Sequence, residues 1–506
     1  RDASCGLQKP HEAPMGMIGL LFVLLQLQLV ASTTFCDNAT SSSGYLRAGP
    51  DTFYFYWLVR SEKSKPLILW LTGGPGCSSI LAMLTENGPC RIKGKGDGWS
   101  IERNPWSWTK AASVLWVDQP AQVGFSTGQP VYNERGVSQR MLSFMENFYL
   151  IYPDLLDVPL FIMGESFAGH YIPSVANALL EASDAGTLVA RPQGLAMGNA
   201  WVSPRAHYSS KPLMAFTGGL QEGGSVGGVV NATVFRSMLD ALPTCLAGVI
   251  SCQDFNGWIP DECLVALERC TQEELQPEVS AGWNAYDSRK VCHKANPIQC
   301  YDFSAEKAFL NDAKVRKALR VPAEQAPWSA CNSVTFQDFA RSGDWLQNSE
   351  HLVAKMLERG VPVLAYSGDT DLMVDWLGTK SWMTSLSWRW KREWSQVTEQ
   401  PFVVRKKSHG RFRSFGGFTF LQVFKSGHLV PMDQPEAALG MVIEFISEKS
   451  PWRHIPEKSP TVFAMQDSLP ALFVAMVASI LILGFAILMS RSCRKTDHSD
   501  SYVVLA

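Results

Sequence analysis

The sequence predicts an α/β fold, in which helices cover a largely parallel sheet. Short apolar runs bounded by glycine and proline recur along the chain, and candidate helices lie between them. The runs span residues 66–71, 113–117, 159–163, 361–366 and 418–424, and the clearest helices span 137–151 and 436–446. Such runs are typical of strands buried on both faces, and alternation of strands with helices indicates a parallel sheet.

Length and charge limit the number of domains and the classes of partner that the chain can have. The 506 residues suit one enlarged domain or two. The 45 Lys and Arg nearly balance the 47 Asp and Glu, so the net charge is only -2. A chain with so weak a field is not expected to bind nucleic acid or an anionic lipid surface.

The amino-terminal region is expected to be removed. Residues 1–14 are interpreted as a doubtful leader, because Met15 or Met17 is the expected initiator. Residues 15–32 are predicted to be a signal peptide, since an apolar core at 18–30 is followed by small residues. A buried core helix is the alternative, but the position just after a candidate start favours secretion.

A second apolar run, at residues 471–489, contains no charge in its 19 residues. At about 1.5 Å per residue it spans roughly 28 Å, enough for a hydrocarbon core, so a transmembrane helix is predicted. Basic residues follow it directly, which places the tail at 490–506 in the cytosol. Residues 451–470 are then a juxtamembrane linker, and the larger part of the chain is lumenal or extracellular in a single-pass type I protein.

Cysteines and sequons fit this location. Twelve cysteines indicate an oxidising compartment, and none has Cys-x-x-Cys zinc spacing. Asn38 and Asn231 begin Asn-x-Thr sequons and are predicted glycosylation sites if the domain is lumenal. Neither a metal nor a cofactor is expected.

The catalytic domain is expected at residues 40–450, with an insertion at about 206–327. Regular strand signals stop in this insertion, where four cysteines and a glycine-rich stretch at 218–228 appear instead. The stretch lacks the Gly-Lys-Ser or Gly-Lys-Thr ending of a phosphate loop, so a flexible surface loop is predicted.

The run at 159–163 leads directly into Gly164-Glu165-Ser166-Phe167-Ala168-Gly169. A serine flanked by small residues between a strand and a helix is typical of a nucleophile elbow, so Ser166 is the candidate nucleophile. Ala168 occupies a position where the general motif has glycine, and a chance turn is the alternative.

A serine nucleophile requires a base that a carboxylate orients. The run at 361–366 is followed by Asp369 and Asp371, and the run at 418–424 by His428. The order serine, acid, histidine is the one expected of the α/β-hydrolase fold. The spacing leaves the choice between the two acids open. A lone histidine is more often structural, but its place after a strand favours a role as the base.

Four segments together resemble the serine carboxypeptidases. They are 70–79 (WLTGGPGCSS), 118–120 (DQP), 164–169 (GESFAG) and 427–431 (GHLVP). The resemblance extends from residue 43 to about 447. It implies an α/β-hydrolase fold and removal of C-terminal residues from peptides and proteins through an acyl-enzyme. The order of signal, enzyme and membrane segment resembles the fungal precursor-processing members of the family.

The resemblance also implies the catalytic residues. They are Ser166, His428 and Asp371, rather than Asp369. The oxyanion hole would consist of the backbone N–H groups of Gly74 and Phe167, and such donors are typically worth about 3 to 4 kcal/mol each.

Recognition of the substrate carboxylate is implied for a protonated pair of acids, Glu86 and Glu165, beside Thr72 and Gly73. The family usually has asparagine where this chain has Thr72, so one amide donor is replaced by a shorter hydroxyl. The acid pair predicts a preference for acidic pH, because two like charges at close range raise the proton affinity of one of them.

The pocket for the residue before the scissile bond is implied to consist of Phe167, Trp345, Met373 and Val374, with Leu429 also in the substrate pocket. These side chains include no acid. Hydrophobic residues are therefore expected to be preferred at this substrate position. This argues against an enzyme that acts strictly at basic residues.

Disulfide pairing is implied as well. Cys36 and Cys90 have no counterpart in the family, and whether they pair with each other stays open. The implied pairs are Cys77 with Cys331, Cys245 with Cys270, Cys252 with Cys263, and Cys292 with Cys300.

Two other functions compete. Relatives with the same triad are acyltransferases, which pass the acyl group to an alcohol, and a catalytically idle protective or binding protein is the second alternative. The complete triad argues against a catalytically idle protein. The presence of Glu86 and Glu165 favours peptides over sugar esters as substrates.

Overall fold

The computed structural model describes residues 31–33, 35–36, 41–62, 65–95, 98–188, 190–218, 227–254, 260–293 and 300–456. The chain divides into two compact units, 1–455 and 456–506, and every element described below belongs to the first. Several expected features lie outside the described residues. They are the leader, the signal core at 18–30, Asn38, the membrane segment at 471–489 and the tail.

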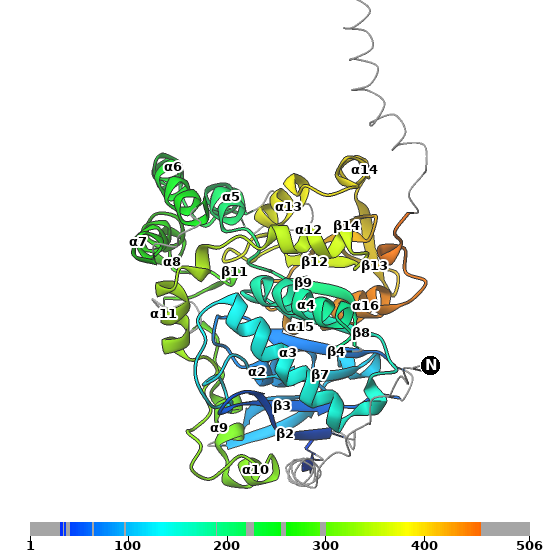
Figure 1. Cartoon of the computed structure of the whole chain (residues 1–506). Coiled ribbons are helices and arrows are strands. Elements are labelled where there is room, and N and C mark those ends of the chain that lie inside the picture. Colours follow the sequence, from blue (N-terminus) through cyan, green and yellow to red (C-terminus); the bar gives the residue numbers. More distant parts are fainter. Residues whose placement is uncertain are drawn as a thin grey trace, which may run out of the picture. The chain divides into compact units, whose positions relative to one another are not determined.

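The first unit is organised around an eleven-stranded sheet (Figure 1). Six neighbouring strands, β7, β4, β8, β9, β12 and β15, are parallel, and antiparallel strands extend the sheet at both edges. In spatial order the strands are β1 (Ala31–Thr33), β2 (Ser41–Gly49), β3 (Thr52–Val59), β7 (Ser113–Val117), β4 (Leu67–Thr72), β8 (Leu160–Glu165), β9 (Pro192–Gly198), β12 (Val363–Gly368), β15 (Phe418–Val423), β14 (Lys407–Phe415) and β13 (Gln400–Val404).

The central strands are buried on both faces, as their apolar runs predict. In β4, Leu69 and Leu71 pack on the side of α3 (Glu134–Ile151) and α4 (Ala168–Asp184), while Trp70 packs on the opposite side with α16 (Pro435–Ile446). The two cores on opposite faces of the sheet fix its position between two helical layers. The α/β fold class is therefore confirmed.

Outside the segment between α4 and β11, the remaining helices are shorter and frame these layers. They are α2 (Ser79–Ala82), α9 (Ser304–Asn311), α10 (Ala313–Ala318), α11 (Ser333–Arg341), α12 (Glu350–Glu358), α13 (Trp376–Ser385), α14 (Lys391–Gln396) and α15 (Val430–Asp433), with the π-helix η1 (Met83–Asn87) and the 3₁₀ turns η2 (Trp108–Lys110), η3 (Pro153–Leu155), η6 (Asp344–Leu346) and η7 (Pro451–Arg453). A separate two-stranded ribbon is formed by β5 (Cys90–Lys95) and β6 (Gly98–Arg103).

Between β9 and β12 the described chain adds no strand to the main sheet, in keeping with an insertion. This part contains α5 (Pro204–Thr217), α6 (Ala232–Asp254), α7 (Pro260–Cys270), η4 (Thr271–Leu275), α8 (Gln276–Ser280) and a small hairpin of β10 (Trp283–Asn284) and β11 (Asp287–Val291). Most of the glycine-rich stretch, residues 219–226, lies outside the described residues.

Among the described helices, α6 is long and apolar enough to cross a membrane, with a mean hydropathy of 1.3 over Ala232–Gln253. Two disulfides, Cys245–Cys270 and Cys252–Cys263, attach it to α7. We therefore interpret α6 as half of a helical hairpin of the globular unit.

Three further disulfides connect other parts of the first unit. Cys77–Cys331 joins the loop after β4 to the segment before α11, and the pairs Cys292–Cys300 and Cys36–Cys90 close shorter loops. Four of the pairings are those that the resemblance implies, and the structure adds Cys36–Cys90, which the sequence had left open.

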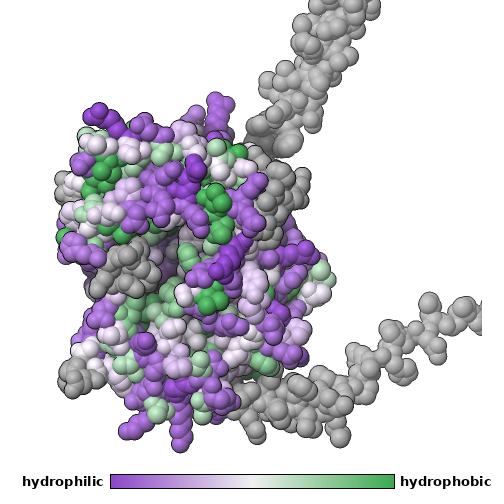
Figure 2. Space-filling view, turned by 90° about the vertical axis from the view of Figure 1, so that its left-hand side faces the viewer, coloured by the Kyte–Doolittle hydropathy of each residue, from purple (hydrophilic) through white to green (hydrophobic). Residues whose placement is uncertain are grey.

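The insertion also contributes exposed apolar side chains. Figure 2 views the side that carries α6, α7 and α11, and it shows green apolar patches and a hollow among hydrophilic residues. The exposed large apolar residues on α5, α6, α7 and α11 are Leu213, Phe216, Leu239, Val265, Val334 and Phe336.

Candidate active site

Ser166 lies at the sharp turn between β8 and α4. Its φ of 63° is in the left-handed region, which a strained nucleophile elbow requires. Gly164 allows the close approach of β4, because a Cβ there would lie 2.0 Å from the carbonyl oxygen of Leu71. Ala168 is already the first residue of α4 and is fully buried. A methyl group is accommodated there, so the turn does not need the glycine of the general motif.

His428 and Asp371 are brought together from the ends of two other parallel strands. Nδ1 of His428 lies 2.7 Å from Oδ2 of Asp371. The Asp371 carboxylate also accepts hydrogen bonds from the backbone N–H groups of Met373 (2.9 Å) and Val374 (3.2 Å). These bonds fix the plane of the carboxylate and, through it, the orientation of the imidazole.

The charge of Asp371 affects the pKa of His428. Burial lowers the pKa of His428, but the charge of Asp371, their hydrogen bond and the charge of Glu165 together raise it above its ordinary value. Asp369, the other candidate acid, instead accepts a hydrogen bond from the backbone N–H of Ser426 at 3.2 Å. The geometry therefore pairs His428 with Asp371.

Asn199 is a partner of the acid that the sequence did not indicate. Its side-chain amide donates to Oδ2 of Asp371 at 2.8 Å, and its side-chain oxygen accepts from the N–H of Gly368 at 3.1 Å. Lys211 also holds the loop that contains Asp371, because its buried ammonium group donates a hydrogen bond to the carbonyl oxygen of Leu372 at 2.6 Å. A polar residue at the carboxyl end of an apolar strand, here β9, is the signal that could have revealed Asn199.

Two backbone N–H groups beside Ser166 are available as donors. Gly73 packs directly against the elbow, because a Cβ there would lie 2.4 Å from the backbone nitrogen of Phe167. The next residue, Gly74, has a φ of 114°, which side chains rarely tolerate. Among the described residues, the N–H groups of Gly74 and Phe167 have no hydrogen-bond acceptor. They can therefore donate to a substrate oxygen.

Glu86 and Glu165 form a buried acid pair. Glu86 lies in η1 and Glu165 is the last residue of β8, and each is only 2% exposed. Burial raises the pKa of both carboxyls; the neighbouring Glu165 raises that of Glu86 further. The pKa of Glu165 reaches about 7, although the charge of His428 and the hydrogen bond with Glu86 oppose the rise. The pair can thus remain protonated far above the range of ordinary carboxyls.

The acid pair, Ser166 and His428 line one hollow of about 50 Å³. Thr72, Gly74 and Leu429 also line it, and Oγ1 of Thr72 accepts a hydrogen bond from Nε1 of Trp70 at 2.9 Å. The threonine hydroxyl thus keeps its proton for another acceptor. The other residues that line the hollow are Cys77, Leu81, Ala82, Tyr286, Tyr301, Phe303 and Cys331.

Several of these lining residues were not expected from the sequence, and three of them have a shared origin. Tyr286, Tyr301 and Phe303 come from the insertion, whose fold has no local sequence signal. The Tyr286 ring lies 4.7 Å from the His428 ring, and its carbonyl oxygen accepts from the His428 backbone N–H at 2.8 Å. The insertion therefore forms part of the wall over the histidine.

The residues expected to bind the side chain before the scissile bond lie on the other side of the elbow. Trp345 stacks on Phe167 with a centroid distance of 5.2 Å. Met373 is half-buried and Val374 is buried, and both follow Asp371 in its loop. These residues do not line the hollow that holds the acid pair. The arrangement separates an apolar side from an acidic side of Ser166.

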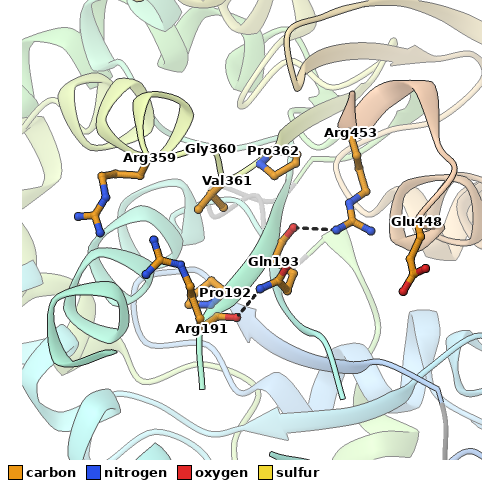
Figure 3. Close-up of a pocket in the computed structure, with 9 residues that line it drawn as sticks. All are labelled: Arg191, Pro192, Gln193, Arg359, Gly360, Val361, Pro362, Glu448 and Arg453. Carbon is orange, nitrogen blue, oxygen red and sulfur yellow. Dashed lines mark hydrogen bonds between the residues drawn. The ribbon is translucent and has the colours of Figure 1, made fainter. Parts of the chain in front are cut away.

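Arginine is a common ligand of carboxylates, and the structure has an arginine-lined hollow (Figure 3), of about 210 Å³. Arg191, Arg359 and Arg453 surround it together with Glu448. However, this hollow lies at the amino ends of β9 and β12, whereas Ser166 follows the carboxyl end of β8. An anion bound there would not reach the nucleophile.

A serine elbow, followed by an acid and a histidine after later parallel strands, defines an α/β hydrolase. The chain belongs to the serine carboxypeptidase family, peptidase family S10, whose model matches residues 32–448. The family confirms the expected activity: the protein is a serine-type hydrolase that acts on the C-termini of peptides.

Individual relatives agree with this membership. The chain is 34% identical over 418 residues to carboxypeptidase Y of Candida albicans, covering 81% of this chain and 74% of the relative. It is 33% identical over 412 residues to carboxypeptidase Y homolog A of Fusarium vanettenii, covering 79% and 73%. It is 32% identical over 405 residues to serine carboxypeptidase-like 48 of Arabidopsis thaliana, covering 78% and 75%.

A solved structure shows the same fold. The prohormone-processing carboxypeptidase Kex1Δp of Saccharomyces cerevisiae superposes with a TM-score of 0.72 at 22% identity, covering 83% of this chain and 95% of that one.

Proposed function

We propose that Ser166, His428 and Asp371 hydrolyse the last peptide bond of a substrate whose free carboxylate is held by Glu86 and Glu165. The observation that carries this assignment is the shared hollow, in which a buried acid pair with raised pKa values lies beside the serine and the histidine. A carboxyl group that keeps its proton can donate to a carboxylate, whereas an ionised one would repel it.

The reaction then follows from the positions of the groups. Nε2 of His428 takes the proton of the Ser166 hydroxyl as Oγ forms a bond to the scissile carbonyl carbon. The N–H groups of Gly74 and Phe167 stabilise the resulting oxyanion. The imidazolium returns the proton to the leaving amine, which departs with the C-terminal residue. Water then attacks the acyl-enzyme with His428 again as base, which regenerates Ser166.

The test uses the purified full chain and a mixture of peptides, with C-terminal trimming followed by mass spectrometry. We expect stepwise loss of single C-terminal residues. Ser166→Ala should lose both this activity and covalent labelling by a serine-directed fluorophosphonate, whereas the control Ser209→Ala, on the exposed side of α5, should keep both. Activity that survived in Ser166→Ala, or labelling of another serine, would refute the assignment.

We also propose that the enzyme works in the secretory pathway, anchored by the segment 471–489, with residues 490–506 in the cytosol. Five disulfides support an oxidising compartment. Asn231 is exposed, and its side chain caps the start of α6 by accepting from the N–H groups of Thr233 and Val234, both at 3.0 Å. The amide nitrogen of Asn231 thus stays free to carry a glycan.

Expression in secreting cells tests the location. The full chain should stay in the membrane pellet after alkaline carbonate extraction, and a chain that ends before residue 471 should appear in the medium. Asn231→Gln should increase electrophoretic mobility relative to the wild type, and deglycosylation should narrow the difference. Carbonate release of the full chain would exclude the anchor, and equal mobility would exclude a glycan at Asn231.

A further inference from the structure

A second polar cluster lies behind the elbow, outside the catalytic hollow. Glu134 begins α3, His170 lies in the first turn of α4 and Asp344 begins η6. One imidazole nitrogen and one oxygen from each carboxylate lie within 4.8 Å of one another, and Nδ1 of His170 is 3.9 Å from Oδ2 of Asp344. Three separate segments of the chain therefore direct potential ligands to one point.

His170 and Asp344 are buried, Glu134 is half-buried, and polar side-chain atoms of all three lack partners. His170 is fully buried and Asp344 is 5% exposed. Both ring nitrogens of His170, both carboxylate oxygens of Glu134 and Oδ2 of Asp344 have no hydrogen-bond partner of ordinary geometry. A buried polar atom without a partner is costly, so a group of five at one place requires an explanation.

The charge of the cluster is also uncompensated. Two carboxylates lie side by side, and within the described residues no lysine or arginine pairs with either of them. The hydroxyl of Ser174 lies beside Glu134, and the buried hydroxyl of Tyr171 interacts with both carboxyls. Burial and the neighbouring Asp344 raise the pKa of Glu134, and a doubly charged cation bound between the two carboxyls would favour their charged forms.

We propose that Glu134, His170 and Asp344 bind one divalent transition-metal ion, such as Zn²⁺ or Mn²⁺. One imidazole and two carboxylates form a mixed nitrogen and oxygen set, which suits these ions, whereas Ca²⁺ and Mg²⁺ prefer oxygen ligands alone. An ion at about 2.1 Å from each donor would draw the three donors slightly closer together. Ser174 or a water molecule can complete the coordination.

The site is structural rather than catalytic. Asp344 precedes Trp345, and the ring of His170 lies 4.5 Å from that of Phe167, which itself stacks on Trp345. The ion would thus connect α3, α4 and η6 directly behind the apolar side of Ser166. The metal site would be separate from the acid pair, because Glu86 and Glu165 contribute no ligand.

Metal content of the full chain tests the site. The chain, without a histidine tag, is expressed in medium supplemented with Zn²⁺ or with Mn²⁺ and purified by gel filtration, and its metal content is measured by plasma mass spectrometry. We expect close to one ion per chain in the wild type. The isosteric variant Asp344→Asn and the variant His170→Gln should retain less than about a tenth of this content, because each removes a ligand.

The matched control is His207→Gln. His207 is also fully buried on a helix, but its Nε2 contacts the carbonyl oxygen of Ala200 at 3.1 Å and it lies outside the cluster. It should keep the wild-type metal content. Equal content in the wild type, Asp344→Asn and His170→Gln would overturn the proposal.

A measurement on the wild type alone covers the case in which the variants do not fold. Protein expressed with Co²⁺ should show a visible absorption band that saturates at one ion per chain. Wild-type protein without bound metal and without this band would mean that a proton held between the two carboxyls, and no metal ion, stabilises the cluster. That result would also overturn the proposal.

Discussion

Asn199 donates its side-chain amide to the same oxygen of Asp371, Oδ2, that lies 2.7 Å from Nδ1 of His428. The carbonyl oxygen of the same side chain accepts from the N–H of Gly368, at the end of β12. Asn199 therefore links the ends of β9 and β12 and holds the carboxylate in the plane that orients the imidazole.

We expect Asn199→Ala to lower kcat while changing KM little. Loss of a hydrogen bond to a charged group costs about 1.5 to 3 kcal/mol, which corresponds to roughly a 10- to 100-fold lower rate if it affects only the transition state. Steady-state kinetics on a blocked dipeptide would measure the effect. Asn177→Ala, at a half-buried position on α4 where the amide donates to Glu181, is the control. An unchanged kcat would show that the backbone bonds of Met373 and Val374 suffice to hold Asp371.

Strands with strong apolar runs indicated Ser166, His428 and two candidate acids, and the family resemblance selected Asp371 between the acids. The sequence did not predict Asn199, since β9 contains Pro192, Gly194 and Gly198, which hide the apolar pattern of a buried strand. The edge strands were missed because they alternate or are polar, as in β14.

The acid pair illustrates a different limit. Glu86 lies on a π-helix far from Glu165 in the chain, and only the resemblance linked the two. Tyr286 and Tyr301 could not be placed at all, because the insertion carries no periodic signal that fixes where it returns to the sheet. Local patterns thus predicted five of the six parallel strands, all but β9, whereas contacts that depend on loop packing required the structure.

The residue before the scissile bond should be hydrophobic. Phe167, Trp345, Met373 and Val374 offer aromatic and aliphatic surface without an acid, so a lysine or arginine side chain would lose hydration without gaining a partner. Peptides that differ only at this position would be compared by kcat/KM. Phenylalanine or leucine should exceed arginine by roughly tenfold or more, as one buried apolar side chain is worth about 1.5 to 3 kcal/mol.

The variant Trp345→Ala should reduce this preference, because it removes the ring that stacks on Phe167. Trp99→Ala, at a ring that packs on Phe309 away from the elbow, serves as the control. A strong preference of the wild type for arginine or lysine would contradict the assignment of this pocket.

The disulfide Cys77–Cys331 should contribute more to stability than Cys292–Cys300. Its cysteines are 254 residues apart, against 8 for the other pair. Loop-closure entropy then gives about 5.5 kcal/mol for the first bond and about 2.5 kcal/mol for the second, as upper values. Denaturant unfolding of the double variants Cys77→Ser/Cys331→Ser and Cys292→Ser/Cys300→Ser would test the order. Equal losses would show that strain or residual structure outweighs loop length.

Peptide hydrolysis should be favoured at acidic pH because of Glu86 and Glu165. Burial raises the pKa of both carboxyls, to about 7 for Glu165. Below that pH the pair is neutral and donates to the substrate carboxylate. As pH rises through about 7, Glu165 loses its proton and the site meets an anionic substrate with a negative charge of its own, so binding weakens.

The activity of the triad depends on pH in the opposite direction, so its effect can be separated from that of the acid pair. His428 acts as a base only when it is neutral, and its pKa is raised, so the chemical step improves as pH increases. A peptide and its C-terminal amide should therefore differ. The amide carries no charge, so its kcat/KM should rise with pH and then stay level, whereas kcat/KM of the peptide should fall on the alkaline side. In Glu86→Gln and Glu165→Gln the peptide should lose much of this alkaline fall, because glutamine cannot ionise. Parallel profiles for peptide and amide in the wild type, or an unchanged peptide profile in both variants, would show that the acid pair does not govern recognition.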